Sequence, residues 1–429
     1  MESFTDQFCS LTPWDLSLLS LNYIQWGLLF STPSFHLSAD DMINCLKTSL
    51  STTLSHFCPL AGRFLVEKKH DSMFVSINCC GEGIEFIHAI ADNLAVSDVL
   101  APLDDVPSFV SSFFPLNEAI NYEGHFSPLL SVQVTELADG IFMACSFNHA
   151  AGDGVSFHNF LHTWAEICRT KGTEGRVTNE CHPSHSRWFL EGVNTPIKLP
   201  FSHPDEFIGT YSPPPDLRER FFHLSSQSIA HLKSKANAEI KTEKEISSFQ
   251  ALCSLVWRSV TRARCIPADQ KTRCNFAADN RARLQPPLPA DYFGNAAVLI
   301  GASVTVGELL SNSLGWGARL LQQSIIAHTD ERIRSALRDW LKAPVVHRLG
   351  NSDAHGVTIG SSPRFDLYGC DFGWGKAVAL RSGSANKHEG KVSLYQGQEG
   401  RGSVDLEVCL PPAAMAALLA DAEFIASVS

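Results

Sequence analysis

The chain has 429 residues, of which 44% are hydrophobic and 18% charged, and a formal net charge of -11. This composition is typical of a folded globular protein and excludes a disordered or fibrous chain, while the length predicts two domains, with one large α/β fold as the alternative. The negative charge argues against nucleic acid or an anionic membrane as a partner, because polyanions are bound through basic surfaces.

Localisation is inferred from the absence of sorting features. The first residues are acidic where a secretory leader is basic, and no stretch reaches the roughly 18 to 20 apolar residues of a membrane span. The 13 cysteines are scattered without a CxxC pair, which predicts reduced thiols and no disulfide framework. We therefore expect a cytoplasmic protein.

The first part of the chain predicts a helix and then a β-hairpin that leads into a second helix. Apolar residues at helical spacing indicate a helix that ends before Pro59. Residues 130–137 and 141–147 read as two strands joined by a tight turn. The loop 148–154 follows, and Asp153 is a suitable N-cap for the amphipathic helix after it.

A proline-rich segment divides the chain. Residues 178–215 lack sustained helical or strand periodicity, which predicts a crossing between a domain at 1–177 and a domain at 216–429.

The second part mixes helix and strand signals. A capping box formed by Ser247 and Gln250 opens a helix that we expect to reach Arg264. Helical signals also cover 305–341 and 411–420, and strand-like runs occur at 276–279, 296–300 and 404–410. The alternation predicts a mixed α/β architecture.

The pattern HxxxD occurs three times, at His36–Asp40, His88–Asp92 and His149–Asp153. Only the third lies between a buried strand and a helix, with glycines on both sides of its aspartate. Histidine is the natural base near neutral pH but also a common core residue, so the pattern alone leaves both roles open for His149.

Three segments together resemble the plant BAHD family of acyl-CoA-dependent acyltransferases. They are Asn148–Gly154 (NHAAGDG), Tyr292–Asn295 (YFGN) and Asp371–Gly375 (DFGWG), in the order and separation of that family. The likeness extends from Leu11–Asp15 to Ser403–Val408, nearly the whole chain. It implies an α/β fold of two similar-sized domains of the chloramphenicol acetyltransferase type, with mixed sheets and a channel at their interface.

The resemblance also implies a reaction. His149 would take a proton from an alcohol, phenol or amine of plant specialised metabolism as it attacks the thioester of an acyl-CoA co-substrate. Coenzyme A leaves as a thiolate, so neither a covalent acyl-enzyme, a metal nor a permanently bound cofactor is required. We expect a monomer whose partners are the donor and a small-molecule acceptor.

Several motif residues are expected to be architectural. The resemblance implies an ion pair between Asp153 and an arginine, with an Asp153–His149 dyad as the alternative. Gly154, Gly373 and Gly375 belong to the same structural motifs. We expect Asp371 to pair with Arg281, and the indole of Trp374 or amides near Gly152 to Gly154 to stabilise the oxyanion, although Trp374 could equally be core packing.

An enzyme of net charge -11 needs local cations for the phosphates of coenzyme A. Cations beside DFGWG are the candidates, with those at the end of the capped helix as a second group: Lys376, Arg381, Lys387, Lys391, Arg262 and Arg264. A solvated basic stretch is the alternative for each of them.

Other readings have less support. His158 and His162 have a spacing that suits zinc but lack an obvious third ligand. A lyase or cyclase acting on the same scaffold without coenzyme A is the alternative function, and a silent binding protein is another.

The sequence departs from the usual family pattern at Ala377 and at His388–Gly390, which puts the donor preference in doubt. The acceptor pocket is expected to include Phe35, His36 and residues 349–360.

Overall fold

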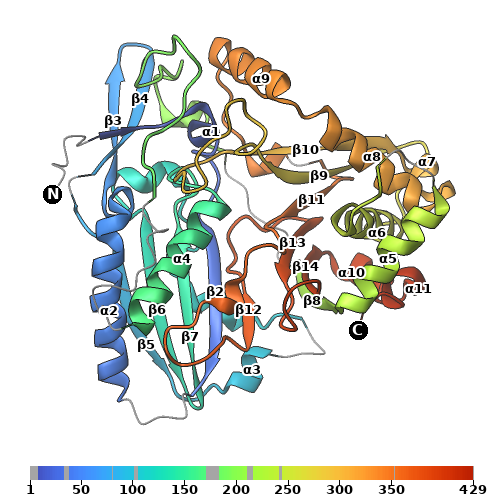
Figure 1. Ribbon diagram of the computed structural model, residues 1–429, viewed down its shortest axis with the longest axis horizontal. Helices are drawn as coiled ribbons and strands as arrows, with labels where there is room; N and C mark the ends of the chain where they lie inside the picture. Colours follow the sequence, from blue (N-terminus) through green and yellow to red (C-terminus); the bar gives the residue numbers. More distant parts are fainter. Residues whose placement is uncertain are drawn as a thin grey trace.

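The computed structural model describes residues 8–32, 38–79, 81–100, 105–170, 183–209, 216–240, 244–351 and 353–428. The chain forms two lobes, each with its own large sheet and its own apolar core (Figure 1). The expected α/β fold with mixed sheets is therefore confirmed.

The first lobe is built on a five-stranded sheet of order β12-β2-β7-β6-β5. Its members are β2 (Ile24–Ser31), β5 (Glu85–Ala91), β6 (Leu130–Leu137), β7 (Gly140–Phe147) and β12 (Ala379–Arg381). All neighbours are antiparallel except β5 and β6. Two packed helices, α2 (Ala39–His56) and α4 (Gly154–Arg169), cover one face of this sheet (Figure 1).

Smaller elements complete the first lobe. A three-stranded sheet of order β1-β4-β3 contains β1 (Phe8–Ser10), β3 (Arg63–Lys69) and β4 (Ser72–Asn78). Two short helices, α1 (Pro13–Leu16) and α3 (Val96–Leu100), lie beside the sheets.

The second lobe is built on a six-stranded sheet of order β10-β9-β11-β13-β14-β8. Its members are β8 (Arg218–Leu224), β9 (Lys271–Asp279), β10 (Ala297–Thr305), β11 (Val357–Gly360), β13 (Lys391–Gln396) and β14 (Val404–Leu410). Its helices are α5 (Ser226–Glu239), α6 (Ser248–Ala263), α7 (Val306–Ser311), α8 (Leu314–Ala327), α9 (Asp330–Lys342), α10 (Pro412–Leu419) and α11 (Ala422–Ile425).

The hairpin and helices predicted from local patterns are confirmed. Strands β6 and β7 are almost wholly buried, and Asp153 caps α4 by accepting a hydrogen bond from the Ser156 amide. The Ser247–Gln250 capping box begins α6, a central helix that packs against β9 and β11. The helical signals over 305–341 resolve into α7, α8 and α9.

The lobes do not divide cleanly along the chain. Strand β12 follows the proposed boundary at 216 by more than 150 residues in sequence, yet it pairs with β2 in the first sheet. The described part of the predicted crossing, 183–209, runs along the first lobe and bridges to both lobes, at Met73–Leu199 and Ser184–Tyr292. The chain therefore passes between the lobes more than once, whereas the sequence predicted a single crossing.

Across the described ranges, no helix combines the length and the apolar character needed to cross a bilayer.

Candidate active site

His149 lies in the loop between β7 and α4. Its neighbours Asn148, Ala150 and Ala151 are fully buried, whereas His149 is partly exposed. The loop is thus a packed segment in which His149 keeps some accessible surface between buried neighbours.

Side chains from distant parts of the chain hold the His149 backbone on both sides. The amide of His149 donates to Oδ1 of Asn121 at 2.7 Å, and Nδ2 of Asn295 donates to the His149 carbonyl at 2.7 Å. Nδ2 of Asn148 in turn donates to the Asn121 carbonyl at 2.8 Å. Asn295 belongs to the second lobe, so the position of His149 depends on contact between the lobes.

The imidazole of His149 is kept neutral by its surroundings. Burial lowers its pKa, because the charged form loses hydration, and the positive charge of Lys391 lowers it further. Asp153 acts in the opposite direction without reversing the shift. Nδ1 is buried and has no hydrogen-bond partner among the described residues. An uncharged imidazole is the form that can accept a proton.

Asp153 is committed to the second lobe. Its Oδ2 accepts from Nη1 of Arg281 at 2.8 Å and from the Ala296 amide at 2.9 Å, and its Oδ1 accepts from Nη2 of Arg281 at 2.9 Å. Oδ1 also caps α4 at Ser156. Burial alone would raise the pKa of Asp153, but Arg281 and the amides of Ala296 and Ser156 together outweigh burial and hold the pKa below its usual range. The ion pair implied by the resemblance is confirmed, and the dyad alternative is not supported.

Arg281 therefore does not pair with Asp371, and that expectation is wrong. Oδ1 of Asp371 accepts instead from the amides of Gly373 at 2.8 Å and Gly375 at 2.9 Å. Both glycines have positive φ angles, 100° and 99°, which other residues rarely adopt. The aspartate closes its own loop, because these close amides supply the hydrogen bonds that a distant arginine was expected to provide.

Trp374 is packed within the first lobe. Its ring stacks on Phe372 and meets Phe30 edge to face, with ring centroids 5.7 Å apart in both pairs. These contacts favour core packing over an oxyanion role for its indole. Gly154, the first residue of α4, lies under Phe365, since a Cβ atom placed there would be 3.0 Å from that ring.

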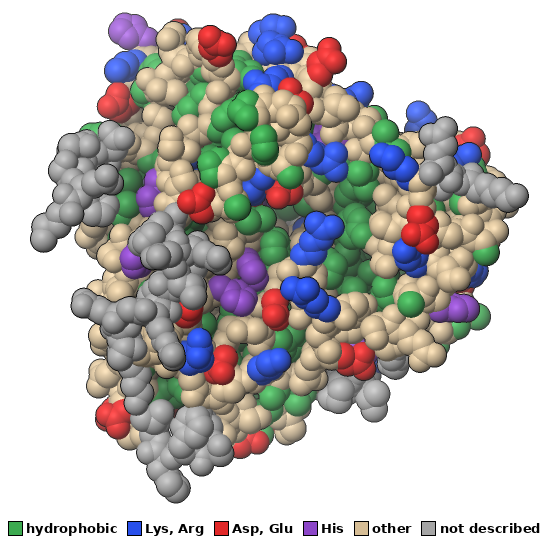
Figure 2. Space-filling view, viewed as in Figure 1, with side chains coloured by type: hydrophobic (Ala, Val, Ile, Leu, Met, Phe, Trp, Pro, Cys, Tyr) green, Lys and Arg blue, Asp and Glu red, His purple; other side chains and the backbone are tan. Residues whose placement is uncertain are grey.

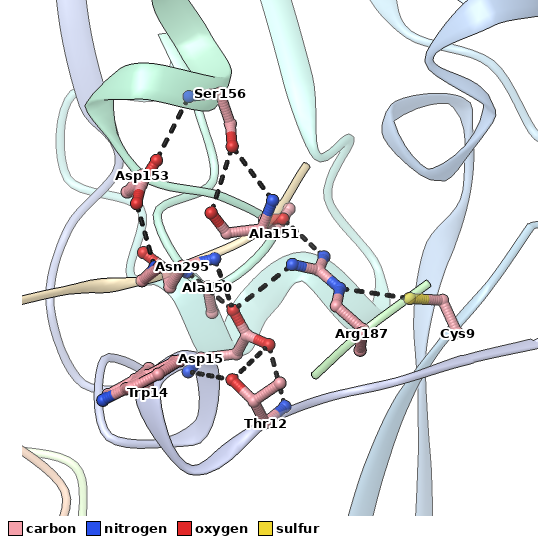
Figure 3. A network of polar contacts seen from close by, with 12 residues as sticks. Cys9, Thr12, Trp14, Asp15, Ala150, Ala151, Asp153, Ser156, Arg187 and Asn295 are labelled. Atoms are coloured by element: carbon pink, nitrogen blue, oxygen red, sulfur yellow. Dashed lines mark hydrogen bonds and ion pairs between the residues drawn. The ribbon is translucent and has the colours of Figure 1, made fainter. Parts of the chain in front are cut away.

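A buried polar network behind the loop was missed by sequence reasoning (Figure 3). Oδ1 of Asp15 accepts from Nδ2 of Asn295 at 2.8 Å and lies 3.6 Å from Nη1 of Arg187. Nη2 of Arg187 donates to the Ala151 carbonyl at 2.7 Å, directly in the His149 loop. Asp15 and Asn295 stand in segments already singled out, LTPWD and YFGN, but Arg187 lies in the segment predicted as a linker and carries no local signal.

The candidate cations differ in exposure and in whether internal groups already bind them. Lys376 is exposed, whereas Arg381 is buried and donates to the carbonyls of Val99 and Leu100. Lys387 is buried in ion pairs with Glu407 and with Glu219, the latter at 3.2 Å. Arg381 and Lys387 are thus incorrect choices for coenzyme A contacts, because Arg381 already bonds backbone carbonyls and Lys387 already pairs with carboxylates.

The second group of cations is also occupied. Arg262 pairs with Asp421 at 2.7 Å and Arg264 with Glu389 at 3.0 Å. The predicted acceptor-pocket residues Phe35 and His36 lie outside the described residues.

His158 and His162, whose spacing would suit zinc, contact each other and the backbone. The rings of His158 and His162 lie side by side, with centroids 4.4 Å apart, and Nε2 of His162 is 2.7 Å from the Asp366 carbonyl. Within the described ranges no third His, Cys, Asp or Glu joins them.

A recess lies between the lobes. Figure 2 shows hydrophobic side chains exposed in it and Lys and Arg side chains along it. Such a setting suits a mainly apolar ligand that carries charged groups.

Comparisons with known proteins identify the family of this chain. A family model described as the Transferase family matches residues 2–425. An uncharacterised acetyltransferase of Arabidopsis thaliana is 37% identical over 421 residues, covering 97% of this chain and 93% of the relative. The Arabidopsis protein Enhanced Pseudomonas Susceptibility 1 is 38% identical, covering 96% and 92%. The Arabidopsis BAHD acyltransferase DCR is 34% identical, covering 97% and 88%.

Solved structures share the fold. Vinorine synthase superposes with a TM-score of 0.76 at 22% identity, covering 100% of this chain and 95% of that one. TRI101 of F. sporotrichioides, in complex with coenzyme A and T-2, gives a TM-score of 0.77 at 16% identity, covering 98% and 99%. With a family model spanning nearly the whole sequence and relatives above 30% identity, the chain belongs to the Transferase family of BAHD acyltransferases, and it is an acyltransferase.

Proposed function

We propose that the protein transfers an acyl group from a coenzyme A thioester to the hydroxyl or amine of a small molecule, with His149 as the general base. The observation that carries this proposal is a neutral, partly exposed imidazole whose backbone is fixed from both lobes. Coenzyme A as co-substrate is supported by the related TRI101 structure, which contains coenzyme A.

The residues around His149 fit this role in simple steps. The neutral ring accepts the proton of the acceptor as the acceptor attacks the thioester carbonyl. Asp153 does not share that proton, because its oxygens are bound by Arg281 and by amides. The tetrahedral adduct collapses with loss of the coenzyme A thiolate, a leaving group that needs no strong acid. The imidazolium is then free to release its proton to water.

The compartment and the oligomeric state belong to the same proposal. We propose a cytoplasmic monomer, on the grounds given by its sequence. Nothing in the geometry favours a lyase or cyclase reaction, because the base required for acyl transfer is in place.

The test is the release of free thiol from a panel of acyl-CoAs in the presence of acceptor pools. His149→Ala should lower the rate by about 10²- to 10⁴-fold, the usual contribution of general-base catalysis. His88→Ala is the matched control, since His88 belongs to another HxxxD pattern but pairs with Glu136 at 2.6 Å. Unchanged thiol release in His149→Ala would remove the assigned base, and no release with any donor would contradict acyl transfer.

A further inference from the structure

One lysine of the second lobe has a charge that no acidic group of the described structure neutralises. Lys391 begins β13 and forms no ion pair or hydrogen bond through its ammonium within the described residues. It is only partly exposed, and burial lowers its pKa, with the positive charge of Lys387 acting in the same direction. A half-buried cation without a counter-charge is costly to the fold.

The carboxylate of Glu407, whose charge acts on Lys391, already has other partners. The field of Glu407 reaches Lys391, but Glu407 is bound by Lys387 and accepts from the hydroxyl of Ser382 at 2.7 Å and 2.8 Å. Tyr395 also donates to Glu407, at 3.2 Å. The thiol of Cys409 stays protonated, because burial raises its pKa. Within the part of the chain that the structure describes, no internal anion is therefore left for Lys391.

The fold makes room for this ammonium. Nζ of Lys391 lies where a side chain at Gly360 would be, since a Cβ atom placed on Gly360 would be 2.5 Å from it. Strands β11 and β13 run parallel there, with Thr358 opposite Lys391 and Gly360 opposite Ser393. Ser361, the next residue, has a left-handed backbone (φ 60°), and its hydroxyl oxygen is buried without a partner in the described structure. Two polar groups without partners among the described residues thus belong to the end of β11, the Lys391 ammonium beside Gly360 and the hydroxyl of the next residue, Ser361.

A short segment links the end of β11 to the loop that carries His149. The chain that leaves β11 at Gly360 reaches Phe365, whose ring lies over Gly154 and stacks on His158 at 5.3 Å. The charge of Lys391 acts on His149 itself. Lys391 and the proposed base thus share one electrostatic environment. The phosphates of coenzyme A are separated from its thioester by the uncharged pantetheine arm, so an anion carried near the reacting atoms suits this position better than those phosphates.

We propose that Lys391, together with the hydroxyl of Ser361, binds a carboxylate carried by one of the two substrates, on the acyl group or on the acceptor. The ammonium supplies the charge that the carboxylate needs, and Ser361 supplies a donor beside it. This inference rests on the proposed acyltransferase function, which it deepens by naming an acidic substrate class.

Equilibrium binding tests the inference without any reaction. Isothermal titration of malonate, succinate and cinnamate, each against its amide, should show at least one acid that binds the protein about 10- to 100-fold more tightly, the usual range for a charged hydrogen bond. Lys391→Met should abolish this preference, and Lys391→Arg should keep part of it. Lys271→Met, an exposed lysine of the same sheet, should behave as the wild type. Melting temperatures measured alongside confirm that each variant is folded.

Kinetics then identify which substrate carries the carboxylate. If it is on the acyl group, Lys391→Met should lower kcat/KM for malonyl-CoA but not for acetyl-CoA. If it is on the acceptor, Lys391→Met should lower kcat/KM for acidic acceptors with either donor. The proposal is overturned if the wild type prefers no acid over its amide, or if Lys391→Met keeps the preference. Preferential acid binding without thiol release from any donor would refute acyl transfer while leaving the carboxylate site in place.

Discussion

At the scale of single residues, the two polar residues of the HxxxD pattern, His149 and Asp153, have different surroundings. His149 and Asp153 are four positions apart, yet one is partly exposed and free of a carboxylate partner while the other is 2% exposed and ion-paired. Arg281 binds the aspartate from the second lobe, so the HxxxD pattern holds the proposed base and, four residues later, a carboxylate that joins the two lobes. The roles differ because burial and partners differ, which the four-residue spacing does not reveal.

The ion pair at Asp153 should be a large contributor to stability. Arg281→Met leaves a buried carboxylate without a counter-charge, and we expect the free energy of unfolding to fall by about 3 to 5 kcal/mol. Denaturant unfolding measures this loss. Lys342→Met is the control, since Lys342 and Asp339 form an exposed pair at 3.0 Å that should contribute under about 1 kcal/mol. Similar losses for both variants would show that the Arg281 contact is not a buried ion pair.

At the scale of elements, the catalytic loop is held by side chains rather than by a sheet ladder. Beyond β7, the backbone of His149 depends on Asn121 before the hairpin and on Asn295 after β9. Asp15 and Arg187 support these contacts from α1 and from the chain that crosses the lobes. Four separate segments thus meet behind one loop, which makes its position rigid.

Asn295→Ala tests this positioning. The variant removes the hydrogen bond to the His149 carbonyl and leaves Asp15 short of a donor, so kcat should fall about 10-fold or more while KM changes little. Steady-state kinetics with a fixed donor measure the split. Asn312→Ala, which removes an exposed contact to the Glu308 carbonyl, is the control and should leave both constants unchanged. A rise in KM with kcat intact would mean that Asn295 serves substrate binding and not the placement of the base.

At the scale of the whole molecule, the two lobes are interlocked. Strand β12 comes from the second part of the chain but completes the sheet of the first, and Asp153 of the first lobe is bound by Arg281 of the second. The core of the first lobe includes residues from both parts of the chain, among them Phe293, Leu367 and Phe372. We expect the lobes to unfold together, since neither part of the chain can complete its core alone.

Stability should decrease in acid because the fold holds histidines neutral. Burial lowers the pKa of His158 to about 4, and burial followed by the charge of Lys391 lowers that of His388 to about 4. The unfolded chain takes up these protons near pH 6.5, so it binds more protons than the folded chain between pH 6.5 and 4. The free energy of unfolding should therefore be lost progressively as the pH falls through that window.

Denaturant unfolding at pH 7.5, 6 and 5 measures this dependence. A double variant, His158→Gln with His388→Gln, should show a shallower decline, while His203→Gln, at an exposed histidine, should match the wild type. A decline equally steep in the double variant would assign the acid sensitivity to other groups.

The sequence by itself determined the elements whose patterns are local. The β6–β7 hairpin, the Asp153 cap of α4 and the capping box of α6 follow from alternation, turn residues and side chains that bond a few positions away. The motif resemblance located His149, since order and spacing of short segments are readable along the chain. Tertiary structure alone decided what each charge pairs with. Arg281 bonds Asp153 across 128 positions, Asn295 reaches Asp15 across 280, and Lys387 finds Glu407 while Lys391 finds no acid among the described residues. The physical reason is that a buried ion takes its partner from whichever chain the packing brings close, and sequence separation carries no information about that distance.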